Sequence, residues 1–256
     1  MLSTAFVTTK PDYPDRERRI RQYLNGLAQI AELSAQYPVF DVYSVDSTVE
    51  DPARLEPQMA GALQRIPGLK GSTHFFDNEF GKHNHGSGVL VQWTRMAPEL
   101  ADRYEYVVHY EPRQHLADFS FFERMASRPD TYFCMYRDRR KLYGIPLTLP
   151  RFWTGLFSMK TRDLLGYVRD EDRLVPPPVK PHPWWWVYYR RLRWRYLPGW
   201  AVWVDECVEV DIPRYVRRHR IPFVRVSDLG TLWHEESKDR MVKMVDADFD
   251  EDGMIA

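Results

Sequence analysis

The chain has 256 residues, of which 44% are hydrophobic; this suits one large folded domain and excludes a disordered chain. Lys and Arg together number 36, as do Asp and Glu, so the overall charge favours neither nucleic acid nor an acidic substrate as a partner. The sequence has no signal-peptide pattern and no apolar run near the ~20 residues of a membrane span. We therefore expect a cytoplasmic protein whose two cysteines are buried thiols.

Hydrophobic patterns of two kinds alternate along the first half of the chain. Short runs of β-branched and aromatic residues predict strands, and apolar residues three and four positions apart predict amphipathic helices. In chain order we expect strand 5–9, helix 14–36, strand 39–47, strand 73–77, a helix from Ser87 that Pro98 bends or ends, strand 104–112, helix 115–126 and strand 131–136. This order predicts βαβ units and a mainly parallel sheet covered by helices.

The second half of the chain adds strand 152–159, helix 160–168, a Pro-rich connection at 175–183, helix 203–219 and strand 221–226. We interpret residues 1–245 as a single α/β domain in which residues 175–203 form a Pro-, Trp- and Arg-rich insertion. Residues 246–256 are an acidic tail that we expect to be mobile. Parallel sheets bind ligands beyond the carboxyl ends of their strands, so polar residues at those ends are the first candidates for function.

One candidate is the stretch GKHNHGSGVL, residues 81–90, which joins a predicted strand to a predicted helix. Backbone N–H groups at a helix start, approached closely at Gly86, would form an anion site to which Lys82 adds charge. The stretch matches neither of the common glycine-rich phosphate motifs, and His83 and His85 alternate across an extended chain, which disfavours a joint metal site. An ordinary turn with a helix cap, a ligand-binding loop and, least favoured, a metal site remain open.

A second candidate is HYEPRQ, residues 109–114, a polar segment at the end of the most apolar predicted strand. Glu111 has the chemistry to bind a metal, a ribose or a sugar hydroxyl, and Arg113 can make a bidentate contact with phosphate. The alternative is a solvated loop with a Glu–Arg pair. The apolar strand before the segment favours a functional role.

Two further segments carry candidate residues near the carboxyl end. In VDEC, residues 204–207, Asp205 and Glu206 can act as a general base, although acidic residues in a first helical turn also simply favour the helix dipole. The segment 181–203 holds six of the nine tryptophans, together with four arginines. It suits stacking on sugars or bases, contact with a membrane surface, or a packed flank with exposed arginines.

Taken in order, these segments resemble bacterial nucleotide-sugar glycosyltransferases of the GT-A type, the small enzymes used in surface-polysaccharide assembly. The likeness covers residues 5–235 and lies in AFVTT before a long helix, SVDS after the second strand, the Lys-x-Asn-x-Gly stretch, HYEPRQ, WTGLFSM and VDE. The resemblance implies a GT-A-like, Rossmann-like sheet, with a nucleotide-diphosphate sugar lying across the strand ends. It also implies a glycan or lipid-linked acceptor and a contact with the inner face of the membrane. The neutral overall charge, rather than the resemblance, predicts no nucleic-acid partner, and nucleic-acid binding is kept as a third and least favoured function.

The resemblance further implies roles for particular residues. It assigns the donor to Thr8, Asp46, Lys82, Asn84, His85, Gly86, Tyr110, Glu111 and Arg113, the acceptor to Thr154, Gly155, Trp185 and Trp186, and the catalytic base to Glu206 or Asp205. The family's Asp-x-Asp motif is absent, because Tyr110, Glu111 and Arg113 occupy its place. This departure puts a Mg or Mn ion in doubt, with Glu111 and His234 as its candidate contacts, and leaves Arg113 or Lys82 to balance the diphosphate charge. A non-catalytic module that docks on lipid or protein through the Trp/Arg-rich segment is the alternative function.

Overall fold

The computed structural model describes residues 1–4, 16–51, 55, 57–75, 87–142, 145–171, 208–235, 240–245 and 247–249. Within these ranges the protein is of the mixed α/β class, as predicted, with six helices and three sheets. None of the described helices is long and apolar enough to cross a membrane.

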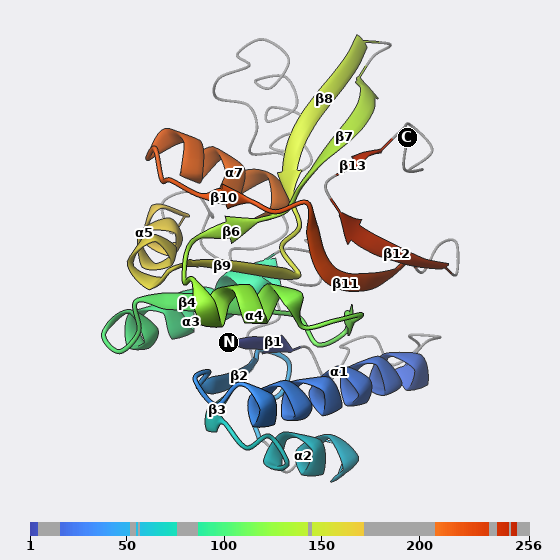
Figure 1. The fold of residues 1–256 in the computed structure, drawn as a ribbon, viewed down its shortest axis with the longest axis vertical. Coiled ribbons are helices and arrows are strands. Elements are labelled where there is room, and N and C mark those ends of the chain that lie inside the picture. Colours follow the sequence, from blue (N-terminus) through green and yellow to red (C-terminus); the bar gives the residue numbers. More distant parts are fainter. Residues whose placement is uncertain are drawn as a thin grey trace, which may run out of the picture.

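The largest sheet has seven strands and determines where the candidate site lies (Figure 1). Its order is β10 (Val224–Arg225), β6 (Tyr132–Phe133), β9 (Leu156–Lys160), β4 (Tyr106–Tyr110), β1 (Leu2–Thr4), β2 (Val42–Asp46) and β3 (Leu69–His74). Only β9 runs against its neighbours within this sheet, and the other strands are parallel to one another. The carboxyl ends of six strands therefore meet at one edge, where β9 begins.

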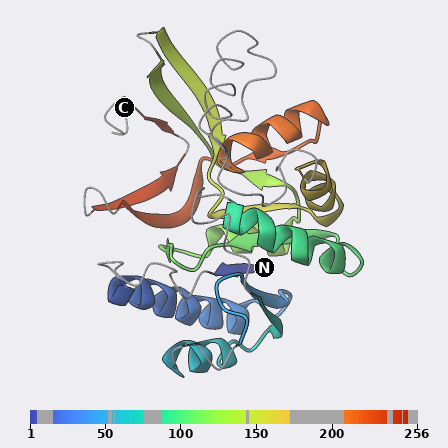
Figure 2. The ribbon, with the colours of Figure 1, turned by 180° about the vertical axis from the view of Figure 1, so that it is seen from behind.

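Helices cover both faces of this sheet (Figures 1 and 2). On one face α1 (Arg16–Gln36), α2 (Pro57–Gln64) and α4 (Ser120–Ser127) bury a cluster that includes Leu27, Met59 and Phe122. On the other face α3 (Ser87–Ala101), α5 (Thr161–Glu171) and α7 (Val208–Arg218) bury a second cluster around Trp93. Successive residues of a strand point to opposite faces, so β4 contributes to both clusters.

Two smaller sheets extend from this body. One has the order β12 (Arg240–Val245), β11 (Asp228–Glu235), β5 (His115–Leu116) and flanks the carboxyl edge of the large sheet. The other has the order β13 (Ala247–Phe249), β7 (Met135–Leu142), β8 (Ile145–Phe152). Its β7–β8 hairpin contacts α7 (Val208–Arg218) near its base and extends outwards from there (Figure 1).

Several elements predicted from the sequence are confirmed, and others are wrong. The helix over 14–36 and the strand over 104–112 correspond to α1 and β4. The third strand lies at 69–74 rather than 73–77, and α2, β7, β8, β11 and β12 were not predicted. Pro98 does not end α3, which continues past it to Ala101 although the proline removes one backbone N–H from the helix. Three residues of the predicted mobile tail form β13.

The helix predicted over 115–126 begins later than expected, for two structural reasons. His115 and Leu116 instead pair with β11 as the short strand β5. A carboxylate oxygen of Asp118 then accepts hydrogen bonds from the backbone N–H of Ser120, at 3.0 Å, and from the Ser120 hydroxyl. Asp118 therefore sets the start of α4, and these bonds lower the pKa of its carboxyl group.

Candidate functional site

The candidate site lies where the order of strands in the large sheet reverses. From β1 the chain builds outwards through β2 and β3, and then crosses to the other side of β1 to form β4. In open α/β sheets, ligands bind in the crevice beyond the carboxyl ends of the strands at such a reversal. The residues after β2, after β4 and before β9 all belong to this edge.

Asp46, the last residue of β2, lies fully buried at this edge. One of its carboxylate oxygens accepts bonds from the backbone N–H groups of Thr48, at 2.7 Å, and Val49, at 3.1 Å, and from the Thr48 hydroxyl at 2.6 Å. Gln92 of α3 donates to the hydroxyl oxygen of Ser47 at 3.1 Å. Asp46 therefore holds the turn after β2 in a fixed shape, at the position where the sequence places a donor contact.

His74 stands beside Asp46 at the end of β3, and the sequence analysis did not select it. The two residues are partners in the β2–β3 register, and the Nε2 atom of His74 lies 2.7 Å from the Ser72 hydroxyl. Burial lowers the pKa of His74, while the nearby charge of Asp46 acts in the opposite direction. The imidazole is therefore biased towards its neutral form, in spite of the neighbouring carboxylate.

The segment after β4 brings Glu111 and Arg113 together. The Nε and Nη2 atoms of Arg113 lie 2.7 and 2.5 Å from one carboxylate oxygen of Glu111, and both side chains are about a quarter exposed. The Glu–Arg pair considered from the sequence is thus present. A guanidinium group in this place opposes a cation at the same carboxylate, so the residues seen here do not fit Glu111 as a Mg or Mn ligand.

Tyr110, expected to contact the donor, has a different position. Its side chain is buried, and its hydroxyl donates a 2.5 Å hydrogen bond to the backbone carbonyl of Gln114. Burial is also the main cause of the raised pKa of this hydroxyl. The Tyr110 side chain therefore holds the segment after β4 in place instead of facing a ligand.

The segment after β4 is clamped between β9 and α1. The backbone N–H of Glu111 donates to the carbonyl of Gly155 at 2.8 Å, and Thr154 beside it is 9% exposed. A Cβ atom at Gly155 would lie 1.3 Å from Nε2 of Gln114, and a Cβ atom at Gly26 of α1 would lie 1.9 Å from the carbonyl oxygen of Pro112. The close approach to backbone requires a glycine at position 26, whereas at position 155 a Cβ atom would displace the end of the Gln114 side chain. Thr154 and Gly155, predicted from the sequence, therefore lie directly against the Glu111 segment.

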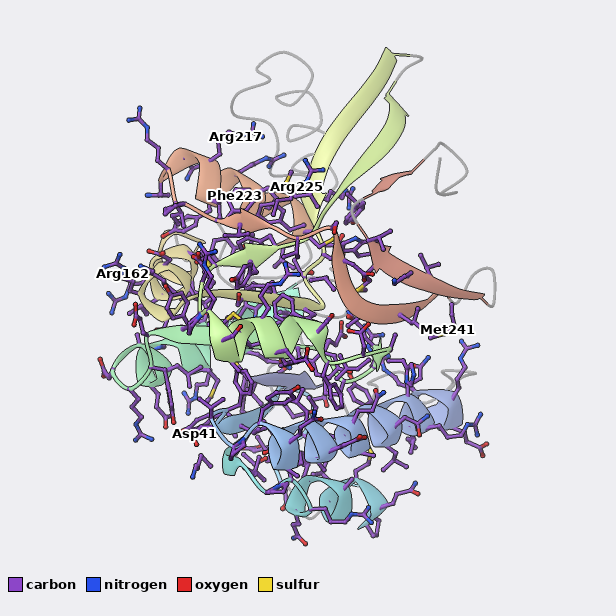
Figure 3. The ribbon with its side chains drawn as sticks, in the orientation of Figure 1. Asp41, Arg162, Arg217, Phe223, Arg225 and Met241 are labelled. Carbon is purple, nitrogen blue, oxygen red and sulfur yellow. The ribbon has the colours of Figure 1, made fainter. Side chains whose placement is uncertain are left out.

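A pocket of about 310 Å³ opens beside this segment, and sequence reasoning missed most of it. One wall comes from the side chains of Arg18, Arg21, Gln22 and Asn25 on α1. The other sides come from Arg113, Gln114 and His115, and from Met241 of β12. Figure 3 shows Met241 beside the amino-terminal half of α1. The available signal was the i, i+3, i+4, i+7 spacing of the four polar residues on α1.

Other predicted site residues are not brought into this arrangement. Among the described residues, no group of three or more His, Cys, Asp or Glu side chains is placed to hold a metal ion. His234 lies in β11, where its backbone pairs with Met241. Outside the described residues lie Thr8, Lys82, Asn84, His85, Gly86, Trp185, Trp186, Asp205 and Glu206, with the rest of the 175–203 insertion.

A scan against protein-family models finds no family that matches this chain. A search of curated proteins likewise finds no match.

Proposed function

We propose that the protein is a GT-A-like glycosyltransferase, which moves a sugar from a nucleotide-diphosphate donor to a hydroxyl of a glycan or lipid-linked acceptor. The observation that carries the proposal is the gathering of Asp46, Glu111 and Gly155 at one edge of the sheet, around the reversal of strand order between β1 and β4. That edge is where nucleotides bind in open α/β sheets. The order of the corresponding segments along the chain is the one that the sequence resemblance requires.

The donor would lie across the ends of β1, β2 and β4. Asp46 offers a carboxylate held in place by the turn after β2, and Arg113 offers a guanidinium group held by Glu111. The preorganised guanidinium group would stabilise the negative charge that develops on a leaving diphosphate without reorganising during the reaction. The Asp46 carboxylate would instead accept hydrogen bonds from hydroxyl groups of the donor. Thr8, Lys82, Asn84, His85 and Gly86 would complete the donor contacts.

The proposed reaction is direct displacement at the anomeric carbon of the sugar. The acceptor oxygen forms a bond to this carbon as the bond from the carbon to the diphosphate oxygen breaks. The acceptor proton passes to the carboxylate of Glu206, with Asp205 as the alternative base, and the nucleoside diphosphate leaves with the bonding electron pair. Thr154 and Gly155 would border the acceptor, and Trp185 and Trp186 would stack on its sugar or approach the inner face of the membrane.

A nucleotide screen tests this proposal. The thermal unfolding of the protein is followed with each common nucleoside diphosphate and nucleotide sugar, and the nucleotides that stabilise it are tested for release of nucleoside diphosphate in the presence of acceptor glycans. We expect a nucleotide sugar to raise the melting temperature, because a ligand that binds only the folded state stabilises it. If no nucleotide stabilises the protein and it binds lipid vesicles strongly, the transferase proposal is wrong and the docking module is favoured.

A further inference from the structure

The pocket between α1 and the segment after β4 has a basic wall built from one stripe of a helix. Arg18 and Arg21 lie on this stripe with Gln22 and Asn25, whereas the apolar stripe of α1, which includes Leu27, is buried against the sheet. The two stripes account for the amphipathic pattern of α1. The polar stripe is more than a solvated surface, because β12 and the 113–115 segment lie beside it and form the other walls of an open pocket.

The opposite wall is fixed relative to α1 by direct contacts. The Gln29 side chain donates to the carbonyl of Leu116 at 2.7 Å and accepts from the N–H of Leu116 at 2.9 Å. Three residues earlier on the same face of α1, Gly26 lies against Pro112. The pocket walls are therefore tied together before a ligand arrives, which lowers the entropic cost of binding.

The chemistry of the lining selects for an anion that also carries a hydroxyl or amide donor. Arg18, Arg21 and Arg113 bring three guanidinium groups to the pocket, and none of its eight lining residues is acidic. Carboxylates from outside the lining pair with two of these arginines, Glu17 with Arg21 at 3.8 Å and Glu111 with Arg113 at 2.5 Å. Gln114 is 3% exposed, and its side-chain oxygen is buried without a hydrogen-bond partner among the described residues. An unsatisfied buried acceptor costs free energy, so a donor from a ligand would be stabilising at this point.

We propose that this pocket binds the phosphate or diphosphate group of a small, hydroxyl-bearing molecule. The arginines contact the phosphate oxygens, since planar guanidinium groups match phosphate in bidentate geometry, and a ligand hydroxyl donates to Gln114. The volume of about 310 Å³ suits a sugar phosphate or part of a nucleotide, and is too small for a macromolecule. The anion site stands without the transferase proposal. The transferase proposal is needed only to identify the molecule that carries the phosphate, which is either the sugar donor or a phosphorylated acceptor.

Calorimetric titration with inorganic pyrophosphate, at constant ionic strength, tests the site directly. We expect wild-type protein to bind pyrophosphate. The double variant Arg18→Gln, Arg21→Gln should bind it at least ~10-fold more weakly, because the loss of one hydrogen bond to a charged group lowers affinity about 10-fold or more. The matched control is Arg217→Gln, an exposed arginine in the last turn of α7, away from the pocket (Figure 3). It should bind pyrophosphate like the wild type. Circular dichroism establishes that both variants are folded.

The site would be overturned if wild-type protein did not bind pyrophosphate, or if the double variant retained binding in full. Equal loss in the double variant and in Arg217→Gln would also overturn it, since this shows attraction by net charge alone. Competition then identifies the source of the phosphate. Displacement of pyrophosphate by nucleoside diphosphates assigns the pocket to the donor, and displacement by an isoprenyl phosphate assigns it to a lipid-linked acceptor. Pyrophosphate binding without sugar transfer would leave the pocket standing and reject the transferase.

Discussion

Gly26 of α1 lies against the carbonyl oxygen of Pro112 so closely that a Cβ atom at this position would be 1.9 Å away from it. The neighbour is backbone, so the clash cannot be relieved by a change of rotamer. We expect Gly26→Ala to lower the free energy of unfolding by roughly 1–3 kcal/mol, as overpacking does, in spite of the better helix propensity of alanine. Urea unfolding measures this change.

Gly61 of α2 is the matched control for this substitution, because a Cβ atom there has no neighbour within 4 Å. Gly61→Ala should therefore stabilise the protein by up to about 1 kcal/mol through helix propensity alone. If both variants were stabilised to the same extent, α1 would not be held against the Pro112 segment as described.

A second prediction concerns the unpartnered side-chain oxygen of Gln114. Gln114→Glu keeps the size of the side chain and places a negative charge inside the arginine pocket. We expect pyrophosphate to bind at least ~10-fold more weakly, because a like charge close to a bound anion costs more than about 1 kcal/mol at low effective dielectric. Isothermal titration gives the affinity. An unchanged affinity together with an unchanged melting temperature would show that Gln114 does not face the ligand.

A third prediction follows from the burial of His109 between α3 and the sheet. Trp93 donates its indole N–H to Nδ1 of His109 at 3.1 Å, and burial lowers the pKa of His109 to about 3, with a smaller contribution from the N-terminal ammonium group. The unfolded chain, with an ordinary histidine pKa near 6.5, binds this proton more readily than the folded protein. The stability that neutral His109 supports is therefore full above about pH 6.5 and is lost as the pH falls from there towards 3.

The contribution of His109 to the pH dependence of the free energy of unfolding is large enough to measure. Between these limits the free energy of unfolding should fall by about 1.4 kcal/mol per pH unit on account of this one group. His109→Gln keeps an acceptor for Trp93 but does not titrate, so its unfolding free energy should fall less steeply with acid. Urea unfolding of both proteins between pH 7.5 and 4.5 gives the two slopes. Parallel slopes would mean that His109 is already protonated, or is exposed, in the folded state.

Local sequence patterns predicted those parts of the fold that local contacts determine. The spacing of Ile20, Tyr23, Leu24 and Leu27 predicted α1, and the apolar run before HYEPRQ predicted β4. The positions of Asp46 and Glu111 at one edge then follow, because parallel strands share their carboxyl edge. Gly155 reaches the same edge only because β9 runs antiparallel to β4, which the sequence did not predict. Non-local pairing was beyond this reasoning. The charged segment MYRDRRKL has no strand-like apolar alternation, and it forms β7 by pairing with β8 and with β13, about a hundred residues later.

The pocket also could not be predicted from local sequence patterns, because its walls come from distant parts of the chain. The polar stripe of Arg18 and Arg21 is typical of a solvated helix face, and nothing in the local sequence distinguishes it from one. It becomes a pocket only because Met241, more than two hundred residues later, and the segment around Arg113 lie against it. Similarly, the segment HYEPRQ by itself does not indicate that the Tyr110 hydroxyl donates a hydrogen bond to the backbone carbonyl of Gln114.

A fourth prediction concerns Lys82, whose part of the GKHNHGSGVL stretch lies outside the described residues. The last residues of the stretch, Ser87 to Leu90, begin α3 at the carboxyl edge of the sheet. If the preceding residues contact a donor diphosphate, Lys82→Ala should weaken nucleotide-sugar binding at least ~10-fold and leave the melting temperature of the unliganded protein unchanged. Titration of the stabilising nucleotide sugar measures the affinity. Unchanged binding would make the stretch an ordinary turn with a helix cap.

A fifth prediction tests the proposed base, Glu206, which precedes α7. Glu206→Gln keeps the size of the side chain and removes its ability to take the acceptor proton, so the rate of sugar transfer should fall roughly 10²–10⁴-fold while the donor still binds. Glu209, three residues later in the sequence, is the matched control, because its carboxylate already accepts a 2.8 Å bond from the Tyr136 hydroxyl and lies 3.3 Å from Arg151. Glu209→Gln weakens this contact and should lower the melting temperature, but the transfer rate per folded molecule should be nearly unchanged. If Glu206→Gln transfers sugar at the full rate and Asp205→Asn does not, the base is Asp205. If both variants retain full activity, the proton leaves by another route and the proposed displacement lacks its base.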